Sequence, residues 1–219
     1  WPILGDADGR VPECMEMPAS GEKCKGSIMG SDDFDTDRLS LNWQWNHNPD
    51  HTKWSLSERP GHMRLKASQA SDLKSARNTL TQRVQGPSSE GTVEMELTGL
   101  KDGNVAGFGI FEFPYAYVAI EQENGKRRLV MCNDGENIET IPDFQGEKLW
   151  IRTRVMDRDF RALFYYSTDG INYKRIGNTL KMGLGLPWTA NRYALFNFSR
   201  TPEGIGGYAD FNWFRFTGK

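Results

Sequence analysis

The feature that most constrains the fold of this sequence is a succession of short runs in which apolar and polar residues alternate. About a dozen such runs, rich in aromatic and β-branched residues, follow one another from residue 41 to the C-terminus. This period of two is typical of half-buried strands. Asn124-Gly125 and Asp169-Gly170 stand between such runs, and both dipeptides favour tight hairpins. The pattern predicts an all-β protein, a two-sheet antiparallel β-sandwich.

The first thirty residues differ from the rest of the chain. They are rich in Gly, Pro and small acidic residues and show no sustained alternation, which is typical of loops. We therefore expect residues 1–30 to be an extended tail or linker and residues 31–219 to form the sandwich. Cys14 and Cys24 flank a short loop in this segment, and the spacing leaves open whether they form a disulfide.

Charge and hydropathy exclude two classes of partner. The formal net charge is −2, from 27 basic and 29 acidic residues, and like charges form no block. Nucleic-acid binding normally requires a basic stripe, and a membrane helix requires an apolar run of about 18 residues. Since the sequence has neither feature, we expect no nucleic-acid partner and no membrane partner.

Acidic residues gather near both ends of the predicted sandwich. Asp33 and Asp35 lie in "SDDFDTDRLS", and Asp210 lies in "GGYADFNWFRF". The first and last strands of a sandwich often lie side by side, which would bring these carboxylates together. They then either hold a structural calcium ion, which takes several oxygen ligands, or remain solvated acids at the strand ends. In the calcium alternative, Asp35 and Asp210 are the expected ligands.

Catalytic motifs are weak in this sequence. Glycoside hydrolysis needs two facing carboxyl groups about 5–9 Å apart, and Glu112 with Glu121 is a candidate pair. Glu112 lies among apolar residues in "FGIFEFPYAY", so it either binds a polar ligand or pairs with Arg83 or Arg192. A nucleophile elbow, a phosphate loop and a dinucleotide fingerprint are all missing from the sequence.

Residues suited to binding sugars are more prominent. Sugar rings stack on aromatic side chains and accept paired hydrogen bonds from planar polar groups. In "LNWQWNHNPD", Trp43 and Trp45 fall on one side of a strand, and Gln44 and Asn46 fall on the other. We expect the tryptophans to pack inside and the amides to face a surface or cleft. The candidate ligand-binding residues are Asn46, His47, Asn48, Arg77, Arg83, Glu112, Tyr115, Tyr117 and Trp188.

Four separated stretches in residues 31–219 resemble a known family: "DDFDTDRLSLNWQWNHNPDHTKWSLSERPGHMRLKA", "ARNTLTQRVQGP", "YYSTDGINYKRIG" and "GGYADFNWFRF". They are similar to the C-terminal concanavalin A-like β-sandwich (jelly roll) of family 43 glycoside hydrolases. Those enzymes are β-xylosidases and α-L-arabinofuranosidases, and the sandwich is also classed as a xylan-directed carbohydrate-binding module of family 91.

The resemblance carries several implications. The segment "WPILGDADGRVPE" is similar to the exit of the β-propeller that precedes this module. The family's catalytic acids lie on that propeller, so none is expected here. "GLGLPWTANRYALF" resembles a loop that inserts an aromatic side chain into the propeller's active-site pocket, with Trp188 in that place; alternatively, Trp188 folds back onto its own domain. The resemblance also implies a secreted, periplasmic or cell-surface location.

Together these patterns predict a non-catalytic module that binds xylan or arabinoxylan chains and completes the substrate pocket of a family 43 propeller domain in the same polypeptide. Three alternatives stay open at this point. The module is purely a structural brace for the propeller, it hydrolyses glycans itself through Glu112 and Glu121, or it binds an unrelated glycan.

Overall fold

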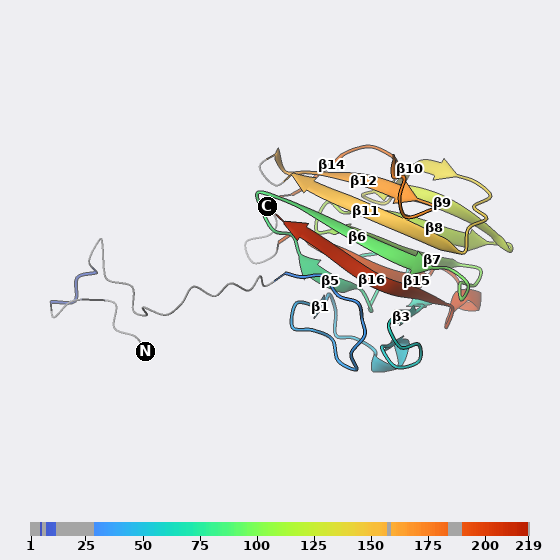
Figure 1. Ribbon diagram of the computed structural model, residues 1–219, viewed down its shortest axis with the longest axis horizontal. Helices are drawn as coiled ribbons and strands as arrows, with labels where there is room; N and C mark the ends of the chain where they lie inside the picture. The colour runs from blue at the N-terminus through green and yellow to red at the C-terminus, as the bar shows by residue number, and fades with distance from the viewer. Residues whose placement is uncertain (1–4, 6–7, 12–28, 157–158, 184–189, 219) are drawn as a thin grey trace.

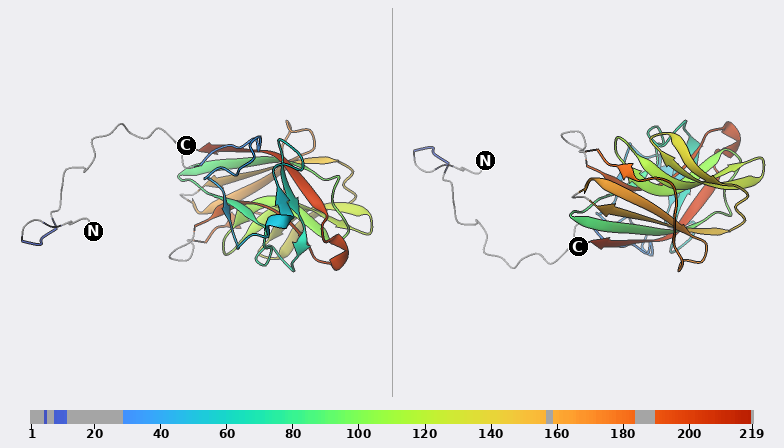
Figure 2. Two further views of the ribbon diagram at one scale, coloured as in Figure 1. Left: turned by 90° about the horizontal axis from the view of Figure 1, so that it is seen from below. Right: turned by 90° about the horizontal axis from the view of Figure 1, so that it is seen from above.

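The computed structural model describes residues 5, 8–11, 29–156, 159–183 and 190–218. Two sheets pack face to face, as Figures 1 and 2 show from three directions. Within the described residues each sheet has eight strands, and every strand pair except β4 with β15 is antiparallel. The predicted fold class, an all-β antiparallel sandwich, is confirmed.

The strands have the following bounds. Sheet B runs in the order β1 (Gln44–Trp45), β5 (Leu80–Arg83), β15 (Arg192–Ser199), β7 (Asn104–Phe111), β8 (Ala116–Glu123), β9 (Lys126–Asn133) and β10 (Glu136–Ile141), with β4 (Ser68–Gln69) beside β15. Sheet A runs in the order β13 (Lys174–Arg175), β12 (Arg161–Ser167), β11 (Lys148–Met156), β6 (Ser88–Glu96), β16 (Tyr208–Gly218), β3 (Met63–Lys66) and β2 (Trp54–Ser55), with β14 (Leu180–Lys181) beside β12. Two short 3-10 helices, η1 (His51–Lys53) and η3 (Pro202–Gly204), lie in connections.

The space between the sheets holds the main hydrophobic core. Along β8, Ala116, Val118 and Ile120 belong to this core, because alternate side chains of a strand point to the same face. Trp43 belongs to it as well and is 7% exposed, and Trp45 packs against it while partly exposed. The expectation that both tryptophans pack inward is therefore confirmed.

A second hydrophobic cluster lies on the outer face of sheet B. The residues of β8 that alternate with the main core, such as Tyr117, pack here against Phe196 of β15. Residues 70–78, which we call the covering segment, contribute Ala70, Leu73 and Ala76 to this cluster. The covering segment thus seals an aromatic sheet face that would otherwise meet water.

The beginning of the sandwich is joined to its last strand. Asp32 and Phe214 exchange backbone hydrogen bonds of 2.9 and 2.8 Å. On the other sheet, the Gln82 side chain donates to and accepts from the backbone of Gly30. The chain therefore enters between the two sheets, at the end of the sandwich where β16 finishes, and Figure 1 shows the C-terminus at this end. We call it the entry end; it carries the strand termini Arg83, Phe111, Met156, Arg192 and Gly218.

The predicted hairpin at Asn124-Gly125 is confirmed. β8 and β9 pair directly on either side of it, from Glu123 opposite Lys126. Both turn residues have positive φ, 51° for Asn124 and 71° for Gly125, which is the backbone conformation that a tight two-residue hairpin requires.

Candidate functional site

Two arginines lie side by side at the entry end of sheet B. Arg83 ends β5 and Arg192 begins β15, and the strand register places them directly opposite each other. Both alternate with inward-facing residues, so their side chains belong to the outer face of the sheet. Arg83 is exposed and Arg192 is partly buried. Two neighbouring guanidinium groups offer several N–H donors at one place.

Arg192 is held by contacts on three sides. Its Nη2 donates to Asn46 Oδ1 at 2.9 Å, and its guanidinium lies 5.3 Å from the ring centre of Phe111. Burial lowers the pKa of Arg192, the charge of Glu112 opposes this effect, and Arg83 adds to it. Among the described residues, the buried Arg192 Nε has no hydrogen-bond partner. An unpaired buried donor is costly, so Nε is a polar atom whose hydrogen-bonding capacity the described residues leave unused.

The other polar residues predicted near Asn46 connect loops instead. His47 Nε2 donates to the carbonyl oxygen of Lys74 at 2.8 Å, and Arg77 Nε donates to that of Asn48 at 2.7 Å. Asn78 adds two bonds to the backbone of Asp50. These contacts join the covering segment to the loop after β1. The structure thus brings His47, Asn48 and Arg77 together, and the hydrogen bonds of His47 and Arg77 satisfy the protein's own backbone.

Three predicted ligand-binding residues are sealed inside the protein, which corrects the expectation for them. Tyr115, Tyr117 and Glu112 are each 2% exposed. The two tyrosines stack on each other beneath the covering segment, with ring centres 6.1 Å apart. Burial raises the pKa of Tyr115 to about 12 and raises that of Tyr117 further. The tyrosines therefore serve as core residues, while Glu112 acts electrostatically on Arg192, one of the two partners considered for it.

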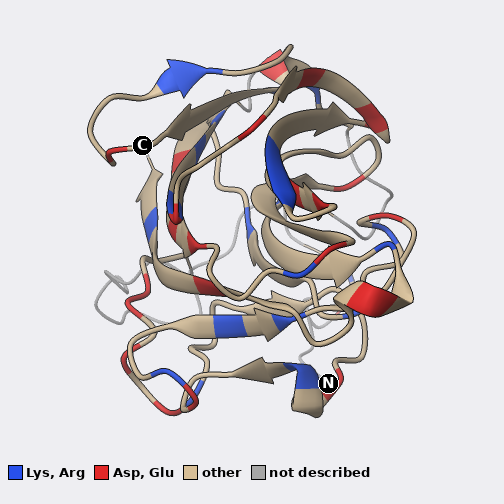
Figure 3. Cartoon of the chain, turned by 90° about the vertical axis from the view of Figure 1, so that its right-hand side faces the viewer, with Lys and Arg blue, Asp and Glu red and all other residues tan. Residues whose placement is uncertain are grey.

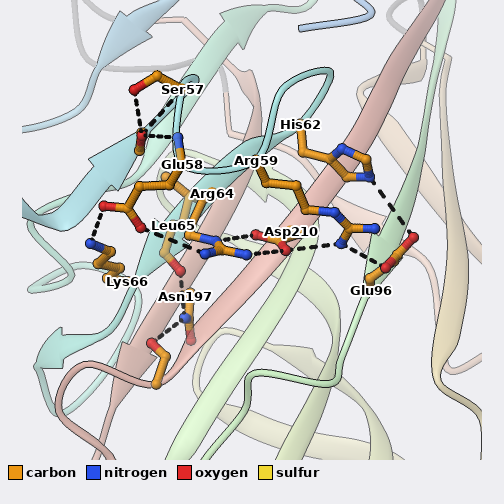
Figure 4. A network of polar contacts seen from close by, with 12 residues as sticks. Ser57, Glu58, Arg59, His62, Arg64, Leu65, Lys66, Glu96, Asn197 and Asp210 are labelled. Carbon is orange, nitrogen blue, oxygen red and sulfur yellow. Dashed lines mark hydrogen bonds and ion pairs between the residues drawn. The ribbon is translucent and has the colours of Figure 1, made fainter.

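Asp210 does not have the surroundings of a calcium ligand. It is 1% exposed, and Arg64 donates to both of its oxygens, at 2.7 and 2.8 Å. Arg59 reaches the same carboxylate at 3.0 Å from the other side, and Figure 4 shows Asp210 between the two arginines. Asp35 is exposed. In the described part of the chain, no three His, Cys, Asp or Glu side chains are grouped as metal ligands. The expected calcium site at Asp35 and Asp210 therefore does not fit the residues present.

The register separates the two candidate catalytic carboxylates. Glu121 lies opposite Val105 on β7, and Glu112 follows that strand seven residues further on, a separation of roughly 23 Å at strand rise. This distance far exceeds what glycoside hydrolysis needs. Glu121 is instead fixed by Arg128 and Arg200, each at 2.7 Å. The arrangement at the entry end can bind and position a ligand, but the proposed acid pair cannot cleave one.

Charges of both signs are interleaved along the strands, as Figure 3 shows. Sixteen ion-pair contacts connect described residues, and the outer face of sheet A carries many of them. A search of the described residues finds no helix with the length and apolarity needed to span a membrane.

Several predicted residues remain untested, and several structural ones were missed. Trp188, Cys14 and Cys24 lie outside the described residues, so their predicted roles stay predictions. Sequence reasoning considered Arg192 only as a partner for Glu112 and did not recognise the covering segment. A usable signal was present for Arg192, because a charged residue directly before the apolar run "YALFNF" marks the first position of a buried strand. The covering segment gave a weaker signal, since Leu73 is the only large apolar residue in "ASDLKSA".

The fold and the polar end of sheet B are typical of a concanavalin A-like accessory module. Comparison with known proteins makes the assignment specific. The family model described as "Beta xylosidase C-terminal Concanavalin A-like domain" matches residues 31–217. The chain therefore belongs to this family.

Relatives and solved structures agree with this assignment. A beta-xylosidase from Formosa agariphila is 32% identical over 99% of this chain and 40% of its own length. A putative beta-xylosidase from Xylanibacter ruminicola is 33% identical over 84% of this chain and 35% of its own length. A bifunctional GH43-CE protein from Bacteroides eggerthii has a TM-score of 0.81 and 39% identity, and the match covers 100% of this chain and 29% of that chain. The chain spans less than half the length of each of these proteins.

Proposed function

We propose that this chain is a non-catalytic accessory module that completes the substrate pocket of a family 43 glycoside hydrolase domain and contacts xylan or arabinoxylan chains there. The observation that carries the proposal is the Arg83–Arg192 pair at the entry end. Arg192 is positioned by Asn46 and Phe111 and keeps a buried N–H without a partner among the described residues. A guanidinium group held in place, with a second one exposed beside it, is well suited to bind sugar hydroxyls.

The path of the chain supports a role beside an upstream domain. Residues 30–32 arrive at the same end of the sandwich that carries Arg83 and Arg192. Any domain that precedes residue 30 is therefore attached to the sandwich at the end that carries this pair. The matched relatives are much longer than this chain and are described as xylosidases, which supports a catalytic partner in the same polypeptide.

Exposed apolar side chains at the entry end support contact with such a domain. Phe113 and Phe160 are 51% and 39% exposed; the first follows β7 and the second precedes β12. Leu41 is fully exposed. Its neighbour Asn42 lies beside Gly30 at the entry end, because a Cβ added to Gly30 would be 2.9 Å from Asn42 Nδ2. Exposed large apolar side chains such as these three are common at interaction surfaces.

The buried aromatic face of sheet B limits where a glycan can bind. Because the covering segment occupies this face, binding is expected at its entry-end margin and not across the sheet. Stacking by Trp188 remains part of the proposal, as does a location outside the cytoplasm, where polymeric xylan is met. Each stacked ring contributes on the order of 1 kcal/mol, so the chain alone should bind no tighter than about 10 µM.

Calorimetric titration with xylohexaose and arabinoxylan oligosaccharides tests this function. Arg83→Ala combined with Arg192→Ala should weaken binding by about tenfold or more, since each lost charge-assisted hydrogen bond costs roughly 1.5 kcal/mol or more. Arg175→Ala, which removes an exposed arginine from sheet A, is the matched control. Trp188→Ala should also weaken binding.

A purely structural brace is the second candidate, favoured by the exposed Phe113 and Phe160. In the polypeptide that carries both domains, Arg83→Ala alone, at an exposed residue, should raise KM for xylo-oligosaccharides while leaving the melting temperature unchanged. If it lowers only the melting temperature, and the isolated chain shows no heat of binding, the brace is correct and the pocket role is wrong.

A further inference from the structure

The outer face of sheet A carries two tryptophans that share one carboxylate. Trp150 on β11 and Trp213 on β16 both lie opposite Glu94, which occupies the strand β6 between them. The Nε1 atoms of both indoles donate to Glu94 Oε2 at 3.1 Å. Glu94 is 7% exposed, whereas both indoles are partly exposed. In Figure 1 these three strands lie side by side.

A β-bulge in β16 places Trp213 beside Glu94 on the outer face of sheet A. The register of β16 against β6 shifts between Phe211 and Trp213, so that Asn212 is the extra residue. With a regular register Asn212 would face Glu94, and Trp213 would turn toward the core. Instead Trp213 points outward, while Phe211 and Phe214 remain in the core. Bulges often re-aim a side chain next to a functional site, and this one places an indole on a solvent-facing surface.

The two indoles are held in fixed orientations. Lys148 completes the Glu94 carboxylate by donating to Oε1 at 2.8 Å, so each carboxylate oxygen has a partner. The Gly170 turn lies against Trp150, since a Cβ at Gly170 would come within 3.0 Å of the indole. That turn is itself rigid, because Asp169 accepts hydrogen bonds from the backbone of Ile171 and Asn172. Pre-positioned rings lose little conformational entropy when a ligand stacks on them.

The charges around the indoles favour a neutral ligand. Lys148 pairs with Glu94 and Glu96, and Arg152 pairs with Glu90 while its guanidinium stacks at 3.7 Å on Tyr173. Arg215, whose guanidinium lies 4.9 Å from the ring centre of Trp213, pairs with Asp33. An ionic ligand would have to displace one of these pairs. A hydroxyl-bearing neutral chain needs only the aromatic rings and the remaining N–H groups of Lys148 and Arg152, whose side chains are 46% and 31% exposed.

We propose that the outer face of sheet A is a second glycan-binding surface, on which Trp150 and Trp213 stack against a neutral polysaccharide chain. The two rings belong to strands on either side of β6, so their backbones are roughly 10 Å apart, a span that suits two neighbouring sugar rings. Trp150 lies six residues from Met156 at the entry end, which is about 20 Å at strand rise. This surface is therefore separate from the Arg83–Arg192 pair and independent of the function proposed for it.

Affinity electrophoresis of the 219-residue chain in gels with soluble arabinoxylan tests the proposal. The wild type should be retarded, and Trp150→Ala and Trp213→Ala should each raise the dissociation constant on the order of fivefold to tenfold. Arg83→Ala with Arg192→Ala is the control for the entry end and should leave the tryptophan-dependent retardation in place. Ile205→Ala, at an exposed residue far from both regions, controls for non-specific effects.

The conservative variants keep the test interpretable if the alanine variants unfold. Trp150→Phe and Trp213→Phe retain a ring without the indole N–H, so they should keep most of the retardation. In NMR spectra of the wild type, the indole N–H signals of Trp150 and Trp213, assigned from these two variants, should shift when xylohexaose is added. Unshifted signals, or full retardation of folded alanine variants, would overturn the proposal. Retardation by polygalacturonate but not by arabinoxylan would overturn the neutral ligand class.

Discussion

The outer face of sheet B is apolar and covered, whereas the outer face of sheet A carries paired charges and remains open to solvent. On sheet B, the aromatic residues of β8 and β15 are sealed by the covering segment. On sheet A, the carboxylates of the neighbouring strands β6 and β16 pair with arginines and lysines of the flanking strands β3 and β11. The comparison shows that the outer face of sheet B adds a second hydrophobic cluster to the protein, whereas the outer face of sheet A stays accessible for contacts. Four measurements would sharpen or break this contrast.

The largest effect is expected from Phe196→Ala on sheet B. Phe196 is fully buried, and its ring packs edge-on against Tyr117 at 4.9 Å. Removing it should lower the free energy of unfolding by about 3–5 kcal/mol, because the cavity adds to the lost burial. Urea unfolding measures this loss. Tyr165→Ala, at a partly exposed residue on the outer face of sheet A, should cost clearly less; equal losses would mean that the two faces do not differ.

On sheet A, Asp210→Ala should lower the free energy of unfolding by about 2 kcal/mol. The change leaves Arg59 and Arg64 without their shared carboxylate, but both are partly exposed and regain water. Asp33→Ala removes an exposed carboxylate that pairs with Arg215 of β16, the strand that also carries Asp210. This change should alter the free energy of unfolding by less than about 0.5 kcal/mol. Chemical denaturation of both variants checks the difference, and a neutral Asp210 variant would contradict the anchoring role.

Alkaline pH should affect sheet B. Burial raises the pKa of Tyr115 from 10.0 to about 12. A folded-state pKa above the unfolded value contributes stability that is complete below the unfolded pKa and is lost as pH rises through the folded pKa. The free energy of unfolding of each protein should fall between neutral pH and about pH 11. This fall should be about 1.4 kcal/mol smaller in Tyr115→Phe than in the wild type. Parallel pH curves for the two proteins would show that Tyr115 is not sealed.

Acid should affect sheet A, with the smallest expected effect. Burial would raise the pKa of Glu96, but hydrogen bonds from Arg59 and Lys148 outweigh it and hold the pKa below 4.5. A depressed pKa gives stability that is present above the unfolded value and is lost as pH falls through the folded value. Glu96→Gln should therefore flatten the decline in stability below about pH 4.5 by less than about 1 kcal/mol. If the stability of Glu96→Gln falls below pH 4.5 as steeply as that of the wild type, other carboxylates cause the decline.

The sequence predicted those parts of the molecule that alternate between a buried and an exposed face. The core strands, the hairpin at Asn124-Gly125 and the inward tryptophans follow directly from that pattern. β10 was missed because five of its six residues are exposed, so the strand has no apolar side to give a periodic signal.

The site was predicted less well, because its residues depend on contacts far apart in the sequence. Tyr115 and Tyr117 look like exposed stacking residues until the covering segment, some forty residues earlier, is placed over them. Asp210 looks like a free acid until Arg59 and Arg64 are brought beside it from another strand and loop. Asn46 and Arg83 were correctly placed at a surface, and the step that sequence could not supply was the pairing with Arg192.

The strands that end the sheets are short. The two sheets have four edge strands, and three of them, β1, β2 and β13, have two residues each. The fourth, β10, is interrupted by a register shift and carries Glu136 and Glu139. Long, flat borders invite strands of other molecules to add to them and begin fibrils. Edge strands this short, or this charged and irregular, offer such strands little template, so the sandwich is protected against edge-to-edge aggregation.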